Sequence, residues 1–256
     1  MINLRYITCS DPRENVSTDD MIRLMEIDDS VEIGVQCDEV SMKKRAPRYE
    51  WFEELWRKAD EELDEPKLAL HVNGDWCTDF CNGKIPQEII RWMSLCTPSL
   101  ASSLIIPRIQ LNIGFNLNEI SPEGVAEVIR QRGFRREFIF PLNEYTEPFI
   151  RQLHEITQDF SLLFDGSYGA GMSPEKWERP IFYDIKHGYA GGLSPENVAD
   201  NLAKISKAAW GWVKDNLIWI DAEGQLMKPK SRHFDVNRAR AYINAALEFA
   251  KRNDGR

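Results

Sequence analysis

A glycine-rich turn near residue 190 has the sequence features of an anion-binding loop. Residues 188–198 read GYAGGLSPENV, so an apolar strand ending leads into two glycines, followed by Ser194 and Pro195. Serine is a common helix N-cap, and proline fits the first helical position. Glycines let a backbone approach a ligand closely, and a helix N-terminus favours an anion. We therefore predict a strand-to-helix turn at which Gly191 and Gly192 bind an anionic substrate group.

Two titratable side chains end other apolar runs. Cys9 closes the run 4–9, where a thiolate could act as base or nucleophile; the alternative is a small buried apolar residue. Asp165 closes the run SLLFD, where burial would raise its pKa and suit a general acid; the alternative is an aspartate capping its own loop. Gly169 and Gly171 follow it and indicate a loop that lies close to a ligand.

Further polar residues lie at the ends of the second, third and fourth expected strands. Arg48 closes a basic loop before an aromatic helix, and its guanidinium could bind a carboxylate or phosphate, unless the loop is simply solvated. Gln110 is positioned to contact a ligand. His71 is better interpreted as a structural imidazole than as an acid or base. These positions give a candidate set of substrate-binding residues.

The end of the eighth expected strand gives a mixed signal. Gly224 and the nearby Lys228 and Lys230 would help to hold a phosphate. Asp221 and Glu223 would repel one. Gly224 is kept as a candidate substrate-binding residue.

The sequence favours neither a metal nor an organic cofactor. Cys77 and Cys81 lie one helical turn apart, but no second pair or nearby histidine completes a zinc site. No G-x-G-x-x-G follows the first strand, which disfavours a dinucleotide. The number of cysteines, five, is odd and their spacing is irregular, which favours reduced thiols.

Composition and charge narrow the class of protein. The net charge is -9 with acidic residues spread along the chain, which argues against nucleic acid and anionic membranes as partners. No apolar run reaches the roughly 18 residues of a membrane span, and residues 1–9 lack the order of a signal peptide. We therefore expect a cytoplasmic protein whose partner is a small molecule. The sequence does not indicate an oligomeric state.

Strand and helix patterns alternate along the whole chain. The expected strands are 4–9, 31–36, 67–72, 108–113, 137–141, 160–165, one within 181–190, and 217–221. The expected helices are 18–27, 49–63, 85–95, 122–132, 144–157, 195–213 and 236–251, with a short turn near 174–177. Eight such units predict an α/β fold of one domain, 1–256: a (β/α)8 TIM barrel, with a doubly wound open sheet as the alternative. Active sites of this barrel lie where strands end.

The residues at the ends of the expected strands, taken in order along the chain, resemble the motifs of the phosphoribosylanthranilate isomerase family of tryptophan biosynthesis. Residues 190–198 look like the family's seventh-strand phosphate loop almost letter for letter. Residues 162–165, with the glycines after them and Trp177, are similar to its sixth-strand motif. Residues 47–49 resemble its second-loop motif, and Cys9 ends the first strand as the family's catalytic cysteine does. Residues 72–73 and 110–111 fall where the third- and fourth-strand motifs should be.

The resemblance implies an Amadori-type isomerisation of a sugar-derived amine by acid–base chemistry, without a cofactor. By resemblance, Cys9 would be the base and Asp165 the acid. Arg48 would hold the anthranilate carboxylate, and the backbone of Gly191 and Gly192 the sugar phosphate.

The chain departs from the family at three of its motifs. Ser10 follows Cys9 where the family has glycine, and Asn112 replaces a histidine after the fourth-strand motif. Ala222 and Glu223 precede Gly224 where the family is rich in serine and glycine. The substrate could therefore differ from that of the tryptophan pathway.

Two other functions remain open. Glu223 in the phosphate window motivates a lyase or aldolase that acts on an unphosphorylated substrate. Several tryptophans on expected helices motivate a non-catalytic ligand- or partner-binding relative, although such residues more commonly pack helices onto a barrel: Trp51, Trp56, Trp92, Trp210 and Trp212.

Overall fold

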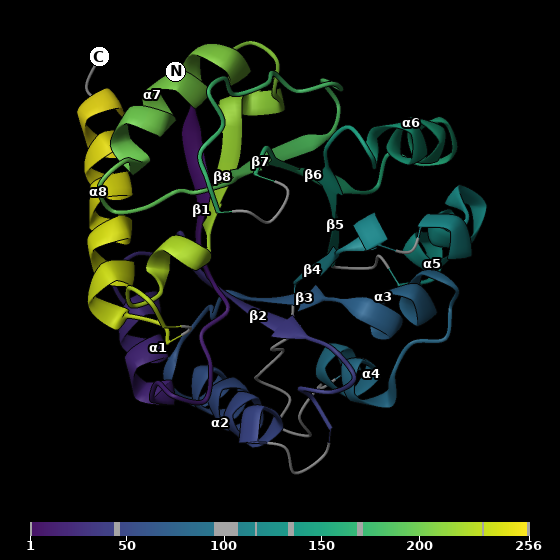
Figure 1. The fold of residues 1–256 in the computed structure, drawn as a ribbon, viewed down its shortest axis with the longest axis horizontal. Helices are drawn as coiled ribbons and strands as arrows, with labels where there is room; N and C mark the ends of the chain where they lie inside the picture. Colours follow the sequence, from purple (N-terminus) through teal and green to yellow (C-terminus); the bar gives the residue numbers. More distant parts are fainter. Residues whose placement is uncertain are drawn as a thin grey trace.

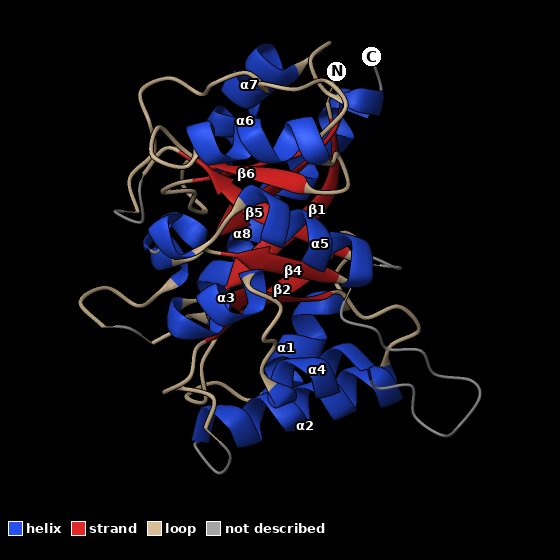
Figure 2. Ribbon diagram, turned by 90° about the vertical axis from the view of Figure 1, so that its right-hand side faces the viewer, coloured by secondary structure: helices blue, strands red, loops and turns tan. Residues whose placement is uncertain are grey.

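Eight parallel strands close into a barrel, with helices outside them (Figures 1 and 2). A computed structural model describes residues 2–43, 47–94, 107–115, 117–132, 136–167, 171–231 and 233–254. Each strand pairs with its neighbours in the sequence, and β1 also pairs with β8 through Cys9 and Ala222. The predicted (β/α)8 barrel is thereby confirmed, and the open sheet is wrong.

The strands are β1 (Asn3–Ser10), β2 (Val31–Cys37), β3 (Leu68–Val72), β4 (Arg108–Leu111), β5 (Glu137–Leu142), β6 (Ser161–Asp165), β7 (Lys186–Ala190) and β8 (Leu217–Ala222). The α-helices are α1 (Thr18–Met25), α2 (Pro47–Glu62), α3 (Gly74–Cys81), α4 (Gln87–Ser94), α5 (Pro122–Arg132), α6 (Glu147–Ile156), α7 (Val198–Ala209) and α8 (Val236–Asp254). Short 3-10 turns are η1 (Ile113–Phe115), η2 (Leu117–Glu119), η3 (Lys214–Asn216) and η4 (Gly224–Leu226).

Each strand has one face toward the helices and one toward the barrel interior, because side chains alternate along a strand. The helix-facing side is apolar and forms the main core with the inner faces of the helices, through residues such as Ile33, Leu70 and Ile220. The interior holds a smaller apolar group of Ile139, Leu163 and Trp219. Burial on both faces explains why the strands read as continuous apolar runs.

A buried cation lies in the barrel interior, at the start of β4. Arg108 is 1% exposed and contacts Glu32 at 2.6 Å and Glu137 at 3.6 Å. Its guanidinium also lies 4.2 Å from the ring centre of Tyr6 and 4.6 Å from that of Trp219. Paired carboxylates and aromatic faces offset the loss of hydration of the guanidinium. This group, the Arg108 plug, fills the barrel interior with charged and aromatic side chains.

Several elements differ from the expected boundaries. A helix not expected from the sequence, α3, precedes α4 between β3 and β4. Between β6 and β7, the described residues 166–167 and 171–185 form turns and bends without a helix. Helix α7 begins at Val198, because residues 194–197 form a turn in which the Ser194 carbonyl accepts hydrogen bonds from the amides of Asn197 and Val198. Ser194 is therefore not the N-cap; Asn197 is.

The tryptophans divide into two groups. Trp51, Trp56 and Trp92 are buried in the helix layer, with Trp92 packed edge-on against Phe52. Trp210 and Trp212 remain 61% and 47% exposed. Helix packing is thus the role of the first group. None of the helices in the described segments is both long and apolar enough to cross a membrane.

Candidate active site

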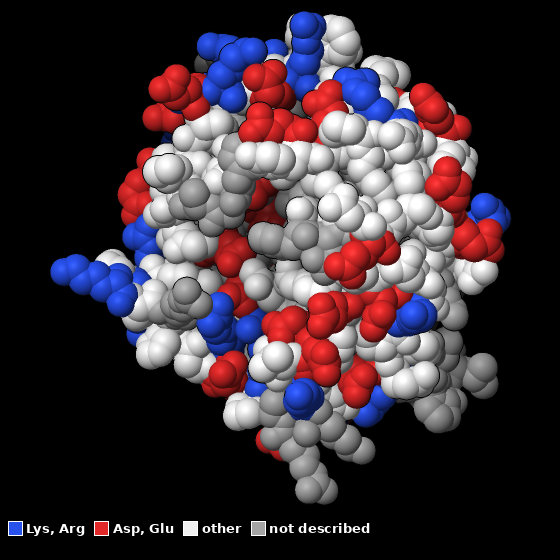
Figure 3. All heavy atoms as spheres, turned by 45° about the vertical axis from the view of Figure 1, so that its right-hand side comes forward, with Lys and Arg blue, Asp and Glu red and all other residues white. Residues whose placement is uncertain are grey.

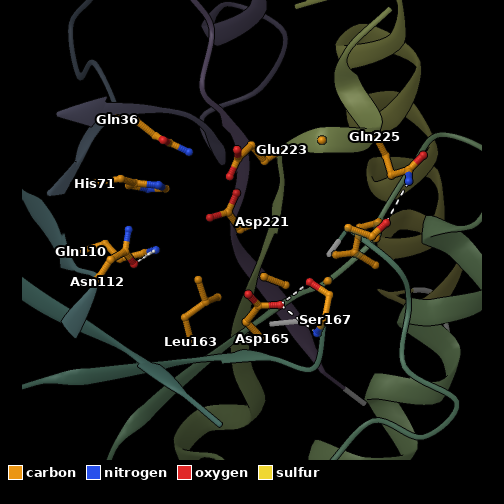
Figure 4. Close-up of a pocket in the computed structure, with 16 residues that line it drawn as sticks. Gln36, His71, Gln110, Asn112, Leu163, Asp165, Ser167, Asp221, Glu223 and Gln225 are labelled. Carbon is orange, nitrogen blue, oxygen red and sulfur yellow. Dashed lines mark hydrogen bonds between the residues drawn. The ribbon is translucent and has the colours of Figure 1, made fainter. Parts of the chain in front are cut away.

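A cavity of about 310 Å³ opens at the carboxyl ends of the barrel strands (Figure 4). Its walls come from the ends of β2, β3, β4, β6, β7 and β8 and from the loops after them. The lining residues are Gln36, His71, Gln110, Asn112, Leu163, Asp165, Ser167, Gly171, Ala190, Gly191, Gly192, Leu193, Asp221, Glu223, Gly224 and Gln225. This is the end of the barrel at which enzymes of this fold place their chemistry.

Cys9 does not face this cavity, which corrects the prediction for the first strand. Its side chain is fully buried and belongs to the apolar core between strands and helices. Burial raises the pKa of the thiol, and the carboxyl of Asp221 raises it further. A thiol held protonated in an apolar layer cannot serve as the base. Alternation places the next residue, Ser10, on the inner face instead.

Ser10 and Asp221 form a buried pair where β1 meets β8. The Ser10 hydroxyl donates a 2.6 Å hydrogen bond to Oδ1 of Asp221, and both residues are over nine-tenths buried. Burial raises the pKa of Asp221 to about 8; the Ser10 hydrogen bond lowers it, and Glu223 nearby raises it. Asp221 is therefore largely protonated at neutral pH and can donate a proton into the cavity.

Asp165 lies at the cavity wall, at the end of β6, as the sequence predicts. Its Oδ1 accepts hydrogen bonds from the Ser167 amide at 3.0 Å and from the Ser167 hydroxyl at 2.7 Å. These bonds fix the orientation of a half-buried carboxylate beside the cavity. Figure 4 shows Asp165 and Asp221 on the same cavity, from strands β6 and β8. The catalytic role of Asp165 stays a prediction.

The double glycine after β7 forms part of the cavity wall. Gly191 and Gly192 have φ of 119° and 59°, which side chains with a Cβ rarely adopt. A Cβ on Gly192 would lie 2.3 Å from the Ser173 amide nitrogen. The Gly192 carbonyl accepts hydrogen bonds from Ser173 Oγ and from Asn197 Nδ2. The turn is therefore held in place by Asn197 of its own loop and by Ser173 of the segment between β6 and β7, and its predicted anion-binding role stays a prediction.

The other candidate glycines lie in two loops at the cavity. Gly171 and Gly224 both line it, and the Gly171 carbonyl accepts a 2.8 Å hydrogen bond from Gln225. This bond joins the loop after β6 to the loop after β8. Gly169 lies outside the described residues.

Arg48 is occupied by an acidic partner, which corrects its assignment to substrate binding. It is 8% exposed, forms an ion pair with the fully buried Asp11, and does not line the cavity. Asp11 also pairs with Arg13 at 2.5 Å. This buried pair holds the Arg48 guanidinium away from the cavity lining, so the side chain does not reach a ligand there.

His71 points into the cavity, a position that the sequence interpretation missed. It is 4% exposed, and its ring forms no hydrogen bond to any described residue. Burial, together with Arg108, lowers the pKa of His71 to about 3, so the imidazole is neutral at physiological pH. Gly34 makes room for it: a Cβ there would lie 2.8 Å from the ring and 2.6 Å from Ser10 Oγ.

A row of amide side chains lies beside His71. Gln110 donates to Asn112 at 2.9 Å, and Asn112 donates to Asn73 at 2.7 Å. Gln110 and Asn112 line the cavity together with Gln36 (Figure 4). Amides both donate and accept hydrogen bonds, as the hydroxyl groups of a polyol require. Gln110 thus lines the cavity, and its role in substrate binding stays a prediction.

The charge of the cavity is acidic. Asp165, Asp221 and Glu223 line it, whereas no lysine or arginine is found among the described lining residues. Loss of hydration raises the pKa of Glu223, and the carboxylate of Asp11 raises it further. Figure 3 shows acidic side chains inside a hollow on the face it displays. A phosphate charge about 4 Å from an ionised carboxylate near a protein surface is repelled by about 4 kcal/mol.

Within the described part of the chain, no group of three or more His, Cys, Asp or Glu side chains is arranged to hold a metal ion. Cys77 and Cys81 are both buried and free on α3, and Cys9 and Cys37 are also free.

Comparisons with known proteins identify the fold. No protein-family model matches the sequence, and no curated protein matches it. Among solved structures, phosphoribosyl anthranilate isomerase from Thermotoga maritima has a TM-score of 0.56 and 14% identity, covering 97% of this chain and all of that one (100%). TrpF from Jonesia denitrificans has a TM-score of 0.54 and 16% identity, covering 96% and 98%. A mutant tryptophan synthase alpha-subunit from Pyrococcus furiosus reaches 0.53 at 11% identity, covering 97% and 100%. Such low identity shows the barrel fold alone.

Proposed function

We propose that this protein is an acid–base isomerase of the aldose–ketose type that acts on a small sugar-derived amine. One observation carries the proposal: the carboxyl groups of Asp165 and Asp221 line a single cavity at the carboxyl end of the barrel. The similarity in fold to phosphoribosyl anthranilate isomerase supports the same class of reaction by analogy.

The two carboxyl groups differ in environment, which suits opposite roles. Asp221 is buried and protonated near neutral pH, so it is the acid. Asp165 is more open and is held by Ser167, so it is the base. This arrangement exchanges the role that the family resemblance implies for Asp165 and replaces Cys9 altogether.

The proton transfers balance over one turnover. Asp221 protonates the ring oxygen of the aldosylamine, the bond from that oxygen to C1 breaks, and a ring-opened iminium forms. Asp165 removes the proton from C2, which gives an enaminol. Asp165 then returns this proton to C1, while the C2 hydroxyl returns a proton to Asp221. The product is a 1-amino-ketose, and both carboxyl groups recover their starting states.

The test is an isomerisation assay on aldosylamines, followed by NMR in D₂O. The expected result is a 1-amino-ketose product from the wild type and a loss of at least about a hundredfold in kcat for Asp165→Asn and for Asp221→Asn. Asp159→Asn is the matched control, since Asp159 is exposed in the loop before β6. Unchanged turnover in both cavity variants contradicts the proposal.

A lyase reaction on an unphosphorylated substrate is the second candidate. Glu223 and the absence of a lysine or arginine among the described lining residues favour an unphosphorylated substrate, which this lyase shares with the proposed isomerase. The same assay separates the two functions, because a lyase yields two shorter carbon fragments and an isomerase yields one product of unchanged mass.

A further inference from the structure

Glu223 lines the cavity and forms no ion pair with any lysine or arginine in the described part of the chain. Arg13, in the first loop, and Arg48, in the first turn of α2, are both paired with Asp11, and Lys43 in the second loop is exposed. Glu223 has Gln36 beside it, and Figure 4 shows this amide directed toward the Glu223 carboxylate. Arg13 acts on Glu223 only through its charge, which lowers the pKa of that carboxyl, so the carboxylate has room for a direct ion pair with a ligand.

His71 gives an independent indication of a ligand. A nearly buried imidazole, with no hydrogen bond to any described residue, is directed into the same cavity (Figure 4). Buried polar groups usually have a partner. A neutral imidazole can accept a hydrogen bond from an O–H or N–H group, and it adds no positive charge that would compete with a cationic ligand.

The size of the cavity and its amides define the rest of the ligand. A volume of about 310 Å³ suits a molecule of roughly ten non-hydrogen atoms. Gln36, Gln110 and Asn112 offer donors and acceptors at several points of the wall, which match a chain of hydroxyl groups.

We propose that the cavity selects an unphosphorylated amino-polyol in its cationic form, with the ammonium group bound by Glu223 and a hydroxyl group bound by His71. This inference rests on the proposed function for the identity of the reacting carbon atoms, but the binding preference is separate from turnover. It replaces the anionic substrate expected from the sequence.

Three probes with the same six-carbon skeleton test the charge preference. Glucamine is a cation, sorbitol is neutral and gluconate is an anion at pH 7. Titration calorimetry on the whole chain is expected to give the affinity order glucamine, sorbitol, gluconate. Glu223→Gln is expected to weaken glucamine binding by about tenfold and to leave sorbitol unchanged. Raised salt is expected to weaken the binding of glucamine to the wild type, because it screens the charge of Glu223, but not to weaken its binding to Glu223→Gln.

Two further variants separate specific from general effects. His71→Phe is expected to weaken glucamine and sorbitol equally, because it removes a contact common to both. Glu155→Gln, on the exposed side of α6, removes one negative charge outside the cavity and is expected to change neither. Thermal melts of each variant check that the fold is retained.

Several results overturn the inference. The inference is wrong if gluconate or inorganic phosphate binds as tightly as glucamine. It is also wrong if the preference for glucamine over sorbitol persists in Glu223→Gln. Failure of glucamine to bind below about 10 mM also counts against it. Glucamine binding without isomerase activity leaves this inference standing and removes the proposed function. Turnover of a phosphorylated sugar amine without glucamine binding would keep the proposed isomerase function and contradict this inference.

Discussion

The Ser10 hydroxyl donates a 2.6 Å hydrogen bond to Oδ1 of Asp221 across the junction of β1 and β8. It is therefore Ser10, one residue after Cys9, that links the first strand to the cavity. The bond holds the carboxyl group in place and favours its ionised form, against the burial that favours the protonated form. The balance between these two effects determines how the cavity responds to pH.

Asp221→Asn is expected to make the protein more stable above pH 5. Folding raises the pKa of Asp221 from 3.8 to about 8, so between these values the folded state binds more protons than the unfolded state. The contribution of Asp221 to the free energy of unfolding therefore falls as pH rises through this window. The variant has no carboxyl group to ionise, so its free energy of unfolding should exceed that of the wild type by about 1–3 kcal/mol at pH 7 and by almost nothing at pH 4. Urea unfolding at both pH values measures this; equal gains contradict it.

The pH profile of kcat/KM is expected to fall above about pH 8, as Asp221 loses its proton. Ser10→Ala removes a hydrogen bond that lowers the pKa of Asp221, so the falling limb should move to higher pH. Ser10→Thr keeps a hydroxyl and serves as the control. A limb that stays in place in Ser10→Ala would show that another group titrates.

Gly34→Ala is expected to damage both stability and activity. The added Cβ would lie 2.6 Å from Ser10 Oγ and 2.8 Å from the His71 ring, so both must shift. Overpacking of this kind costs about 1–3 kcal/mol. Gly114→Ala is the control, because a Cβ there meets nothing within 4 Å. Melting temperatures and kcat for the two variants make the comparison, and equal behaviour would rule out the crowding.

Cys9→Ala is expected to retain kcat and KM. The side chain is buried in the apolar core, so its removal should cost about 1 kcal/mol of stability without touching the substrate. Steady-state kinetics beside a thermal melt measure both effects. A hundredfold loss of kcat in a folded variant would restore the thiol as a catalytic group.

Arg48→Gln is expected to lower stability without a change in KM. It removes one of the two cations that pair with the buried carboxylate of Asp11, while Arg13 remains, which should cost about 1.5–3 kcal/mol. Arg57→Gln, which breaks an exposed pair with Glu61 on α2, should cost less than about 1 kcal/mol. Chemical unfolding gives the difference, and a large rise in KM for Arg48→Gln would indicate that the guanidinium binds substrate after all.

The order of strands and helices was readable from the sequence, whereas the faces of the strands were not. Alternation of β and α patterns predicts the barrel, and short parallel strands leave few other arrangements. The face of β1 was wrong because both of its faces are buried at this end, so Cys9 and Ser10 give no polar alternation to read. The pairing of β1 with β8, a long-range contact, determines which of the two side chains faces the barrel interior.

The acidic character of the cavity also depends on long-range contacts. Arg48 reads as a free cation in the sequence, and only the fold brings Asp11 to it. Asp221 and Glu223 were visible at the end of β8 as an obstacle to a phosphate. The sequence did not predict that these carboxyl groups share a cavity with His71, because His71 lies on β3, which is remote from β8 in the sequence. The glycines of the β7 turn were found because their conformation is a local property.

The Arg108 plug gives the cavity a sealed base. Arg108, Glu32 and Trp219 are each no more than 2% exposed, so the barrel axis offers no passage behind the cavity. Reactant and product must therefore share the opening at the carboxyl ends of the strands. A product must therefore leave through this opening before the next reactant can take its place at the bottom of the cavity.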